Sequence, residues 1–226
     1  MLGCIAAAGA YLATPLARLL ALRFGAVARP RDRDVHIAPT PRWGGLAIWV
    51  GVALALAVAR QMPTLRATFV NGSETTGVLI AGGLICVLGA VDDRFELDAI
   101  TKLTGQIFCA GVMVIFGGVQ LLQVYIPFGD VGTVSFGRDL GVPITILIAV
   151  VTINALNFID GLDGLAAGVT AIAALAFFAH SYHLAVIGST DVAAAPTVLT
   201  ALLAGACIGF LPHNFHPARI FMGDSG

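Results

Sequence analysis

The chain has 226 residues, of which 58% are hydrophobic and only 11% charged, and its mean hydropathy is +0.93. A soluble domain carries about 25% charged residues, so this composition excludes an ordinary soluble domain and indicates an integral membrane protein. The net charge of −1 gives no sign of nucleic-acid binding. The cysteines lie within apolar runs without metal-ligand spacing, so we interpret them as small hydrophobic residues; they are Cys4, Cys86, Cys109 and Cys207.

Apolar runs that approach the roughly 20 residues needed to cross a bilayer recur along the whole chain. They predict an all-α, polytopic membrane protein with about seven transmembrane helices, forming one integral-membrane domain over residues 1–226. The third and fifth runs are short and end in polar motifs. The predicted spans are Leu2–Leu22, Gly44–Ala59, Gly77–Val91, Leu103–Leu122, Val142–Ile153 with its flanks, Leu165–Tyr182 and Ala194–Leu211.

Arginines between the first two spans predict the orientation of the chain. Connections rich in Lys and Arg stay in the cytoplasm, which places residues 23–42 inside. Counting helices onward then places residues 92–102, 154–164 and 212–226 on the same side. Residues 123–141 would lie outside, and their Gly, Pro and Phe content suits a short hairpin. The arginines concerned are Arg23, Arg29, Arg31, Arg33 and Arg42.

Two adjacent carboxylates, Asp92 and Asp93, end the third apolar run and are followed by Arg94. Such carboxylates repel each other unless a cation lies nearby, and the pair suits a general base or the binding of a metal-phosphate complex. The pair is equally compatible with a solvated helix end that has Arg94 as its counter-ion. Lys102, eight residues after Arg94, is suitably placed to contact phosphate.

The stretch NALNFIDGLDGL, residues 154–165, carries an amide or a carboxylate at every third position. This spacing puts the side chains on neighbouring positions of a helical turn. Polar groups are costly beside hydrocarbon, and hard oxygen ligands suit Mg²⁺. The alternative is a capped break between two helices, although such a break needs only one Asx and one Gly. The polar residues are Asn154, Asn157, Asp160 and Asp163.

The last polar motif extends from His213 to Gly226. His213 and His216 are three residues apart, but no Cys or third His accompanies them, which disfavours a zinc site. Arg219 offers a guanidinium fork for phosphate. Asp224, between glycines, is either a turn cap or a ligand.

His36 and Arg42 flank a Pro-Thr-Pro segment, and Trp43-Gly44-Gly45 follows at the start of the second span. Aromatic and basic residues at the start of a span favour an interfacial anchor over a direct catalytic role.

Together these motifs resemble the polyprenyl-phosphate N-acetylhexosamine-1-phosphate transferase family. The resemblance covers essentially the whole chain, and the combination is far more specific than any single motif. The first motif, Asp-Asp-Arg-Phe followed by Lys102 and Gly105-Gln106, is more similar to bacterial GlcNAc-1-phosphate transferases that begin O-antigen, teichoic acid or arabinogalactan synthesis. The family continues beyond Gly-Asp-x-Gly with further spans. We therefore expect the chain to be incomplete at its C-terminus and to have little activity by itself.

The resemblance implies a reaction at the cytoplasmic face of a bacterial plasma membrane. A polyprenyl phosphate, undecaprenyl or decaprenyl phosphate, attacks the β-phosphorus of UDP-GlcNAc, and UMP leaves. The reaction requires Mg²⁺, with Mn²⁺ as an alternative, and a homodimer is compatible with the resemblance. Phosphoryl transfer depends mainly on positioning and charge neutralisation, which agrees with the carboxylates and cations found here.

The resemblance also implies roles for individual residues. Asp92 would deprotonate the lipid phosphate, with Asp93 beside it. Asp224 would bind the metal ion, with Asn157 as a second contact. Asp160 and Asp163 would hold the nucleotide, and Phe221 would stack near the uracil. The full set of substrate-binding candidates is Asn154, Asp160, Asp163, Lys102, Arg219, Phe221 and His36.

Three other functions match parts of the pattern. A cation-coupled transporter would place acids near mid-membrane in an inverted repeat, whereas these acids lie at span ends. A membrane prenyltransferase would carry a DDxxD motif, but Glu96 stands where the third aspartate is required. A phospho-MurNAc-pentapeptide transferase, which uses UDP-MurNAc-pentapeptide, is the nearest alternative.

Overall fold

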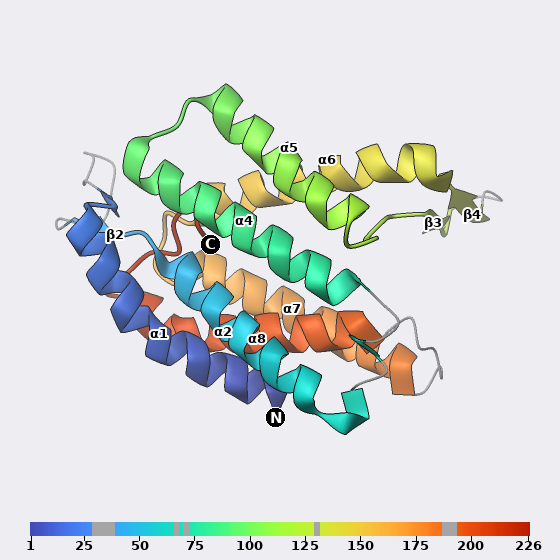
Figure 1. Cartoon of the computed structure of the whole chain (residues 1–226), viewed down its shortest axis with the longest axis horizontal. Helices are drawn as coiled ribbons and strands as arrows, with labels where there is room; N and C mark the ends of the chain where they lie inside the picture. The colour runs from blue at the N-terminus through green and yellow to red at the C-terminus, as the bar shows by residue number, and fades with distance from the viewer. Residues whose placement is uncertain (29–38, 66–67, 70–72, 129–131, 187–193) are drawn as a thin grey trace.

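The computed structural model describes residues 1–28, 39–65, 68–69, 73–128, 132–186 and 194–226 (Figure 1). Seven long helices form this part of the chain, and they confirm the all-α class. Six are long and apolar enough to cross a membrane, and α5 is the shorter apolar one. The helices are α1 Leu2–Phe24, α2 Gly44–Gln61, α4 Glu74–Phe95, α5 Ala99–Ile115, α6 Gly137–Ile159, α7 Leu165–Val186 and α8 Ala194–Asn214.

Short elements connect some of these helices. β1 (Val27–Ala28) pairs with β2 (Thr40–Pro41), and the single-turn helix η1 (Pro63–Leu65) follows α2. The hairpin expected between the fourth and fifth spans is confirmed: β3 (Gln123–Ile126) pairs antiparallel with β4 (Gly132–Ser135).

The predicted boundaries of the fourth span are wrong, and those of the fifth were left open at its flanks. The fourth span was expected at Leu103–Leu122, but α5 begins at Ala99 because the Asp98 carboxylate caps it, accepting the N–H of Thr101 at 3.0 Å. The fifth, expected at Val142–Ile153 with its flanks, is α6, in which the flanks add five residues before the run and six after it. An apolar run marks the stretch that crosses hydrocarbon, whereas the helix continues into the polar boundary. Asn154 and Asn157 therefore lie on α6 and not in the following connection.

Helices α1, α2 and α8 pack through small residues. A Cβ on Gly51 of α2 would lie 2.6 Å from the carbonyl oxygen of Ala6. On α8, a Cβ on Gly205 would overlap the backbone of Gly3, and one on Gly209 would overlap that of Ala7. Glycine lets membrane helices approach until their backbones touch. These contacts fix α1, α2 and α8 as one group.

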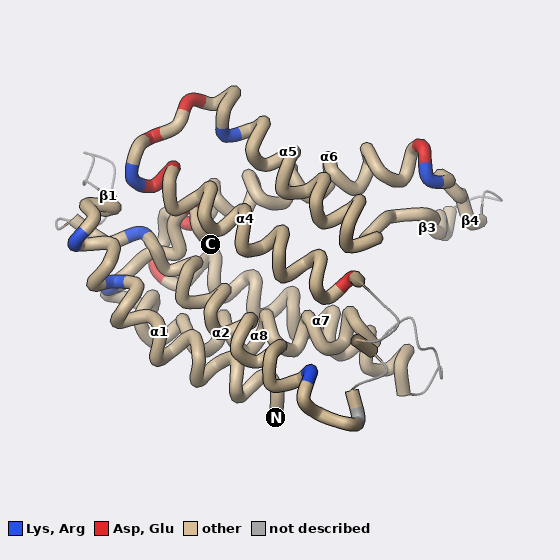
Figure 2. The backbone as a smooth tube through the Cα atoms, in the orientation of Figure 1, with Lys and Arg blue, Asp and Glu red and all other residues tan. Residues whose placement is uncertain are grey.

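Helices α5 and α6 extend away from that group, with α4 between them and α2 (Figure 1). Only Gly141 and Val150 of α6 are buried, and Phe158 is 91% exposed. Charged residues lie at helix ends and in connections, and long central stretches of the helices carry none (Figure 2). The pattern is that of helices whose middles lie in hydrocarbon.

Candidate active site

The site is built on a backbone pairing between residues 41–45 and residues 221–222. The Gly44 and Gly45 N–H groups donate to the carbonyls of Phe221 and Met222, each at 2.9 Å, and the Phe221 N–H donates to Pro41 at 2.8 Å. A Cβ on Gly45 would overlap the backbone of Ser225. The Trp-Gly-Gly motif, expected to be an interfacial anchor, thus also supports the last motif of the chain.

Trp43 is fixed by two contacts. Its indole N–H donates to the carbonyl of Ala90 on α4 at 3.1 Å, and its ring centroid lies 5.8 Å from that of Phe24. Trp43 thereby connects the last residue of α1 to α4 just before Asp92 and Asp93.

A tight turn, Gly223–Gly226, presents Asp224. The Gly226 N–H donates to the Gly223 carbonyl at 3.0 Å. Gly223 has φ +71, a conformation that favours glycine, and a Cβ there would lie 2.6 Å from the Asp93 carboxylate. On the other side, a Cβ on Gly89 of α4 would overlap the backbone of Asp224. The turn is therefore enclosed by close backbone contacts that require glycine.

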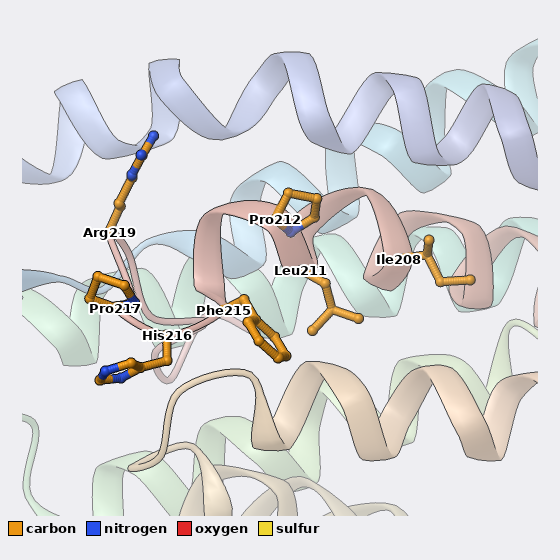
Figure 3. A pocket seen from close by; sticks show the side chains of 7 residues that line it. All are labelled: Ile208, Leu211, Pro212, Phe215, His216, Pro217 and Arg219. Carbon is orange, nitrogen blue, oxygen red and sulfur yellow. The ribbon is translucent and has the colours of Figure 1, made fainter.

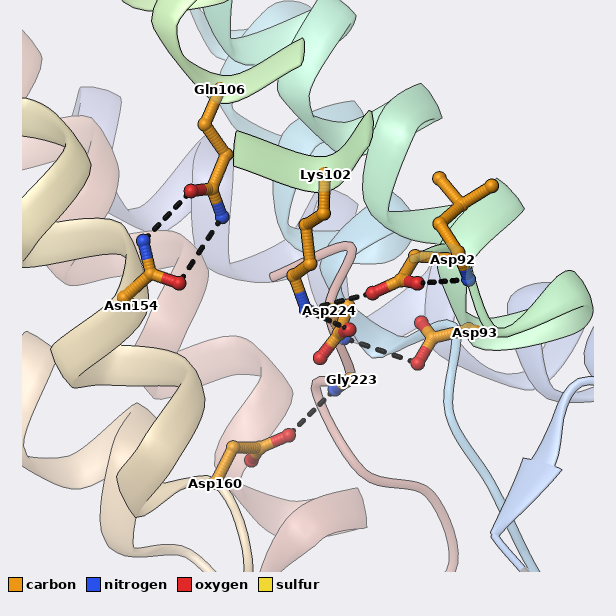
Figure 4. Close-up of polar contacts among 9 residues, drawn as sticks. Asp92, Asp93, Lys102, Gln106, Asn154, Asp160, Gly223 and Asp224 are labelled. Carbon is orange, nitrogen blue, oxygen red and sulfur yellow. Dashed lines mark hydrogen bonds and ion pairs between the residues drawn. The ribbon is translucent and has the colours of Figure 1, made fainter. Parts of the chain in front are cut away.

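Lys102 of α5 bridges two of the predicted carboxylates (Figure 4). Its Nζ lies 2.7 Å from Asp92 Oδ2 and 2.5 Å from Asp224 Oδ2. The other oxygen of Asp92 accepts the Leu97 N–H at 2.8 Å, within the turn from α4 to α5. Burial, and then the neighbouring Asp92 carboxylate, raise the pKa of Asp224 above its ordinary value. The two carboxylates that the sequence separates by more than a hundred residues thus share one cation.

Asp93 and Asp160 contact the same turn through its backbone. Asp93 Oδ1 accepts the Asp224 N–H at 3.2 Å, and Asp160 Oδ2 accepts the Gly223 N–H at 2.6 Å. Asp160 follows the last residue of α6, and burial raises the pKa of its carboxyl to about 7.

Asp163 lies beside the segment that follows α8. Its Oδ2 accepts the Ala218 N–H at 3.1 Å and lies 2.8 Å from His216 Nδ1. The His216 ring is 73% exposed. The arrangement ties the connection between α6 and α7 to residues 216–218.

Arg219 and His216 border a pocket of about 550 Å³ at the end of α8 (Figure 3). Leu211 and Phe215 form its apolar side, and the Arg219 side chain points away from them. The Arg219 carbonyl accepts a hydrogen bond from the Arg18 Nε–H at 3.1 Å. The pocket is lined by Ile208, Leu211, Pro212, Phe215, His216, Pro217 and Arg219.

The remaining predicted residues are placed differently. Asn154 forms an amide pair with Gln106 of α5, with Nδ2 2.7 Å from Oε1, and it also donates to the carbonyl of Val150. Asn157 lies on the last turn of α6, and Phe221 is buried. His36 lies outside the described residues.

The donor set is suitable for a hard divalent cation. Asp92 and Asp224 already converge on the ammonium of Lys102, and carboxylate oxygens are the ligands that Mg²⁺ prefers. Over the residues that the structure describes, no group of three or more His, Cys, Asp or Glu side chains could hold a metal. A metal here would therefore depend on few protein ligands together with substrate oxygens, as is usual for Mg²⁺.

Reasoning from sequence assigned no supporting role to Asn214, Gln106 or Gly89. Asn214 is buried and donates to the carbonyl of Ile220 at 3.0 Å, which holds the start of the last motif. Gln106 orients Asn154, and Gly89 admits the Asp224 turn. Asn214 is the last residue of the apolar helix α8, a position where a buried amide needs a partner, and that signal could have identified it.

Comparisons with known proteins show the family of the chain. The profile described as glycosyl transferase family 4 matches residues 75–226. The chain is 51% identical over 227 residues to the decaprenyl-phosphate N-acetylglucosaminephosphotransferase of Mycolicibacterium smegmatis, covering all of the chain and 56% of that protein. It is 33% identical to a probable undecaprenyl-phosphate N-acetylglucosaminyl 1-phosphate transferase of Bacillus subtilis, covering 94% of the chain and 54% of that protein.

A third relative, the phospho-N-acetylmuramoyl-pentapeptide-transferase of Heliobacterium modesticaldum, is 36% identical over 223 residues, covering 91% of the chain and 62% of that protein. The chain therefore spans a little over half the length of the curated relatives that it matches. The family profile covers more than half of the chain and includes all three acidic motifs. The chain belongs to glycosyl transferase family 4.

Proposed function

We propose that the protein transfers GlcNAc-1-phosphate from UDP-GlcNAc to a polyprenyl phosphate and releases UMP. The observation that carries the proposal is the bridge from Lys102 to Asp92 and Asp224, because it brings the residues that we propose as base and metal ligand to one cation. The names of the relatives from Mycolicibacterium smegmatis and Bacillus subtilis support the choice of sugar and lipid.

Mg²⁺ would be held by Asp224, with Asn157 as a second contact, and would neutralise charge on the diphosphate. Asp92 takes the proton of the lipid phosphate O–H. The freed oxygen then bonds to the β-phosphorus of UDP-GlcNAc, and the bond from that phosphorus to the oxygen of UMP breaks. Lys102 offsets negative charge beside Asp92.

The nucleotide is assigned to the connection after α6 and to the segment after α8. Asp163 and Arg219 would bind its polar groups, whereas the Phe221 ring, expected to stack near the uracil, is buried and offers the base little surface. Arg219 and Phe221 lie a few residues before the Asp224 turn in the chain. Asp163 lies beside the same segment, because its carboxylate contacts residues 216–218. The proposal places this end of the helices at the cytoplasmic face of a bacterial plasma membrane, as the arginines of residues 23–42 indicate.

The test is UMP release from membranes that contain the full-length protein, decaprenyl phosphate and UDP-GlcNAc. Asp224→Asn should abolish release, whereas Asp139→Asn, in the first turn of α6 away from the site, should retain it. No UMP from UDP-GlcNAc would overturn the proposed substrate. UMP from UDP-MurNAc-pentapeptide instead would identify the phospho-MurNAc-pentapeptide reaction, and release unaffected by Asp224→Asn would overturn the metal assignment.

A further inference from the structure

Two consecutive N–H groups of the Gly223–Gly226 turn donate to carboxylates from two different helices. Gly223 donates to Asp160, at the end of α6, and Asp224 donates to Asp93, on the last turns of α4. Asp93 and Asp160 lie on opposite sides of the turn (Figure 4). The backbone that carries Asp224 is therefore held from both sides.

Both oxygens of the Asp160 carboxylate lie against protein. Its Oδ2 accepts the Gly223 N–H at 2.6 Å. Its Oδ1 is enclosed by protein and has no hydrogen-bond partner among the described residues. Asp163 differs, because its Oδ2 holds residues 216–218 at the edge of the pocket. The two aspartates of the DGLDG stretch thus face different surroundings.

We infer that Asp160 is a positioning residue, which sets the direction of the Asp224 carboxylate through the Gly223 N–H and does not contact the nucleotide. This bond is part-buried and only 2.6 Å long, and a short hydrogen bond to a carboxyl oxygen is among the stronger single contacts in a protein. Because Gly223 needs φ +71 to make the turn, a fixed N–H at this residue also fixes where Asp224 points. The inference rests on the proposed function only for the role of Asp224.

The first test is hydrogen exchange at the Gly223 amide of the full-length protein in lipid nanodiscs. Asp160→Ala removes the acceptor, and exchange should become about tenfold faster. Asp160→Asn retains a carbonyl acceptor and should keep exchange near the wild-type rate. Asp163→Ala is the matched control from the same connection, and it should accelerate exchange at Ala218 and leave Gly223 unchanged.

The second test is steady-state kinetics with UDP-GlcNAc. Asp160→Ala should lower kcat at least tenfold with little change in KM, and Asp160→Asn should restore part of kcat. Wild-type exchange at Gly223 in Asp160→Ala would overturn the inference. If Asp160→Ala does not fold, Asp160→Asn is the deciding variant. A tenfold higher KM together with wild-type exchange at Gly223 would show that Asp160 contacts the nucleotide and would overturn the inference. The exchange result does not depend on which sugar is transferred, so it stands even if the proposed substrate fails.

Discussion

The α1–α2–α8 group and the α5–α6 pair are held together in different ways. In the group, backbones touch at glycines, and residues such as Leu202 and Phe210 are fully buried. In the pair, α6 buries only Gly141 and Val150. Its connections are polar: the amide pair of Asn154 with Gln106, and the Asp160 contact to Gly223.

The α1–α2–α8 group therefore contributes mainly to the stability of the fold, and the α5–α6 pair contributes mainly to the candidate site. The tightly packed group supports residues 41–45 and 220–226 and so determines where the Asp224 turn lies. The polar connections bring Lys102 and Asp160 to that turn. Substitutions in the group should therefore act on folding, and substitutions in the pair should act on the site.

The largest effect is expected for Lys102→Met. The substitution leaves Asp92 and Asp224 without their shared cation, and we expect UMP release to fall ~100- to 1000-fold. The protein should still elute as a folded species in detergent, because Lys102 is outside the tightly packed group. Arg60→Ala is the control, since Arg60 contacts Thr76 away from the site. Full turnover by Lys102→Met would refute the shared role of these residues.

Gly209→Ala should act on the other region. Its Cβ would overlap the backbone of Ala7, so α1 and α8 must separate, at a cost of about 2 kcal/mol. The thermal midpoint in detergent reports this loss. Gly168→Ala on α7, where a Cβ meets nothing within 4 Å, should leave the midpoint unchanged or slightly higher. Equal midpoints for both variants would contradict the packing contrast.

The pH dependence of stability should have a component from Asp160. Its folded pKa of about 7 lies above the ordinary value, so the folded state binds the proton more tightly than the unfolded chain. This stabilisation is complete below about pH 4 and is lost as the pH rises through 7. Asp160→Asn should flatten the fall of the thermal midpoint between pH 5 and pH 8. An unchanged slope would argue against burial of the charge.

Asp98→Asn provides the control for that measurement. Hydrogen bonds from Thr101 lower the pKa of the exposed Asp98 carboxyl, so its stabilisation is present above the ordinary pKa and lost at acidic pH. Between pH 5 and pH 8 the Asp98→Asn variant should therefore keep the wild-type slope.

The smallest effect is expected at the amide pair. Gln106→Leu and Asn154→Leu should each loosen α6 from α5. In a double-mutant cycle of thermal stabilities their coupling should be about 1 kcal/mol. Additive effects would show that the pair contributes nothing specific to holding α6.

Local patterns predict the helices and the gathering of acidic motifs at one end. Apolar runs report helices directly, and the positive-inside rule together with the count of spans assigns Asp92, Asp160 and Asp224 to one face. The structure confirms that these residues converge on one turn. Helix ends are less predictable, because caps such as Asp98 lie outside the apolar runs.

Pairings between distant residues could not be predicted. Nothing in the spacing of DGLDG shows that Asp160 would contact a backbone N–H while Asp163 would face the segment after α8. The pairing of Gly44 with Phe221 likewise joins segments far apart in the chain. Such contacts depend on how whole helices pack, which local periodicity does not encode.

The pairing of residues 41–45 with residues 221–222 also has a consequence for biosynthesis. A ribosome completes the Trp-Gly-Gly segment and the Asp92-Asp93 pair while more than a hundred residues are still to be made. Asp92, Asp93 and Gly45 therefore lack their partners in residues 221–226 until that segment has been synthesised. The candidate site therefore forms late and through contacts between distant parts of the chain, and contacts of high sequence separation form slowly.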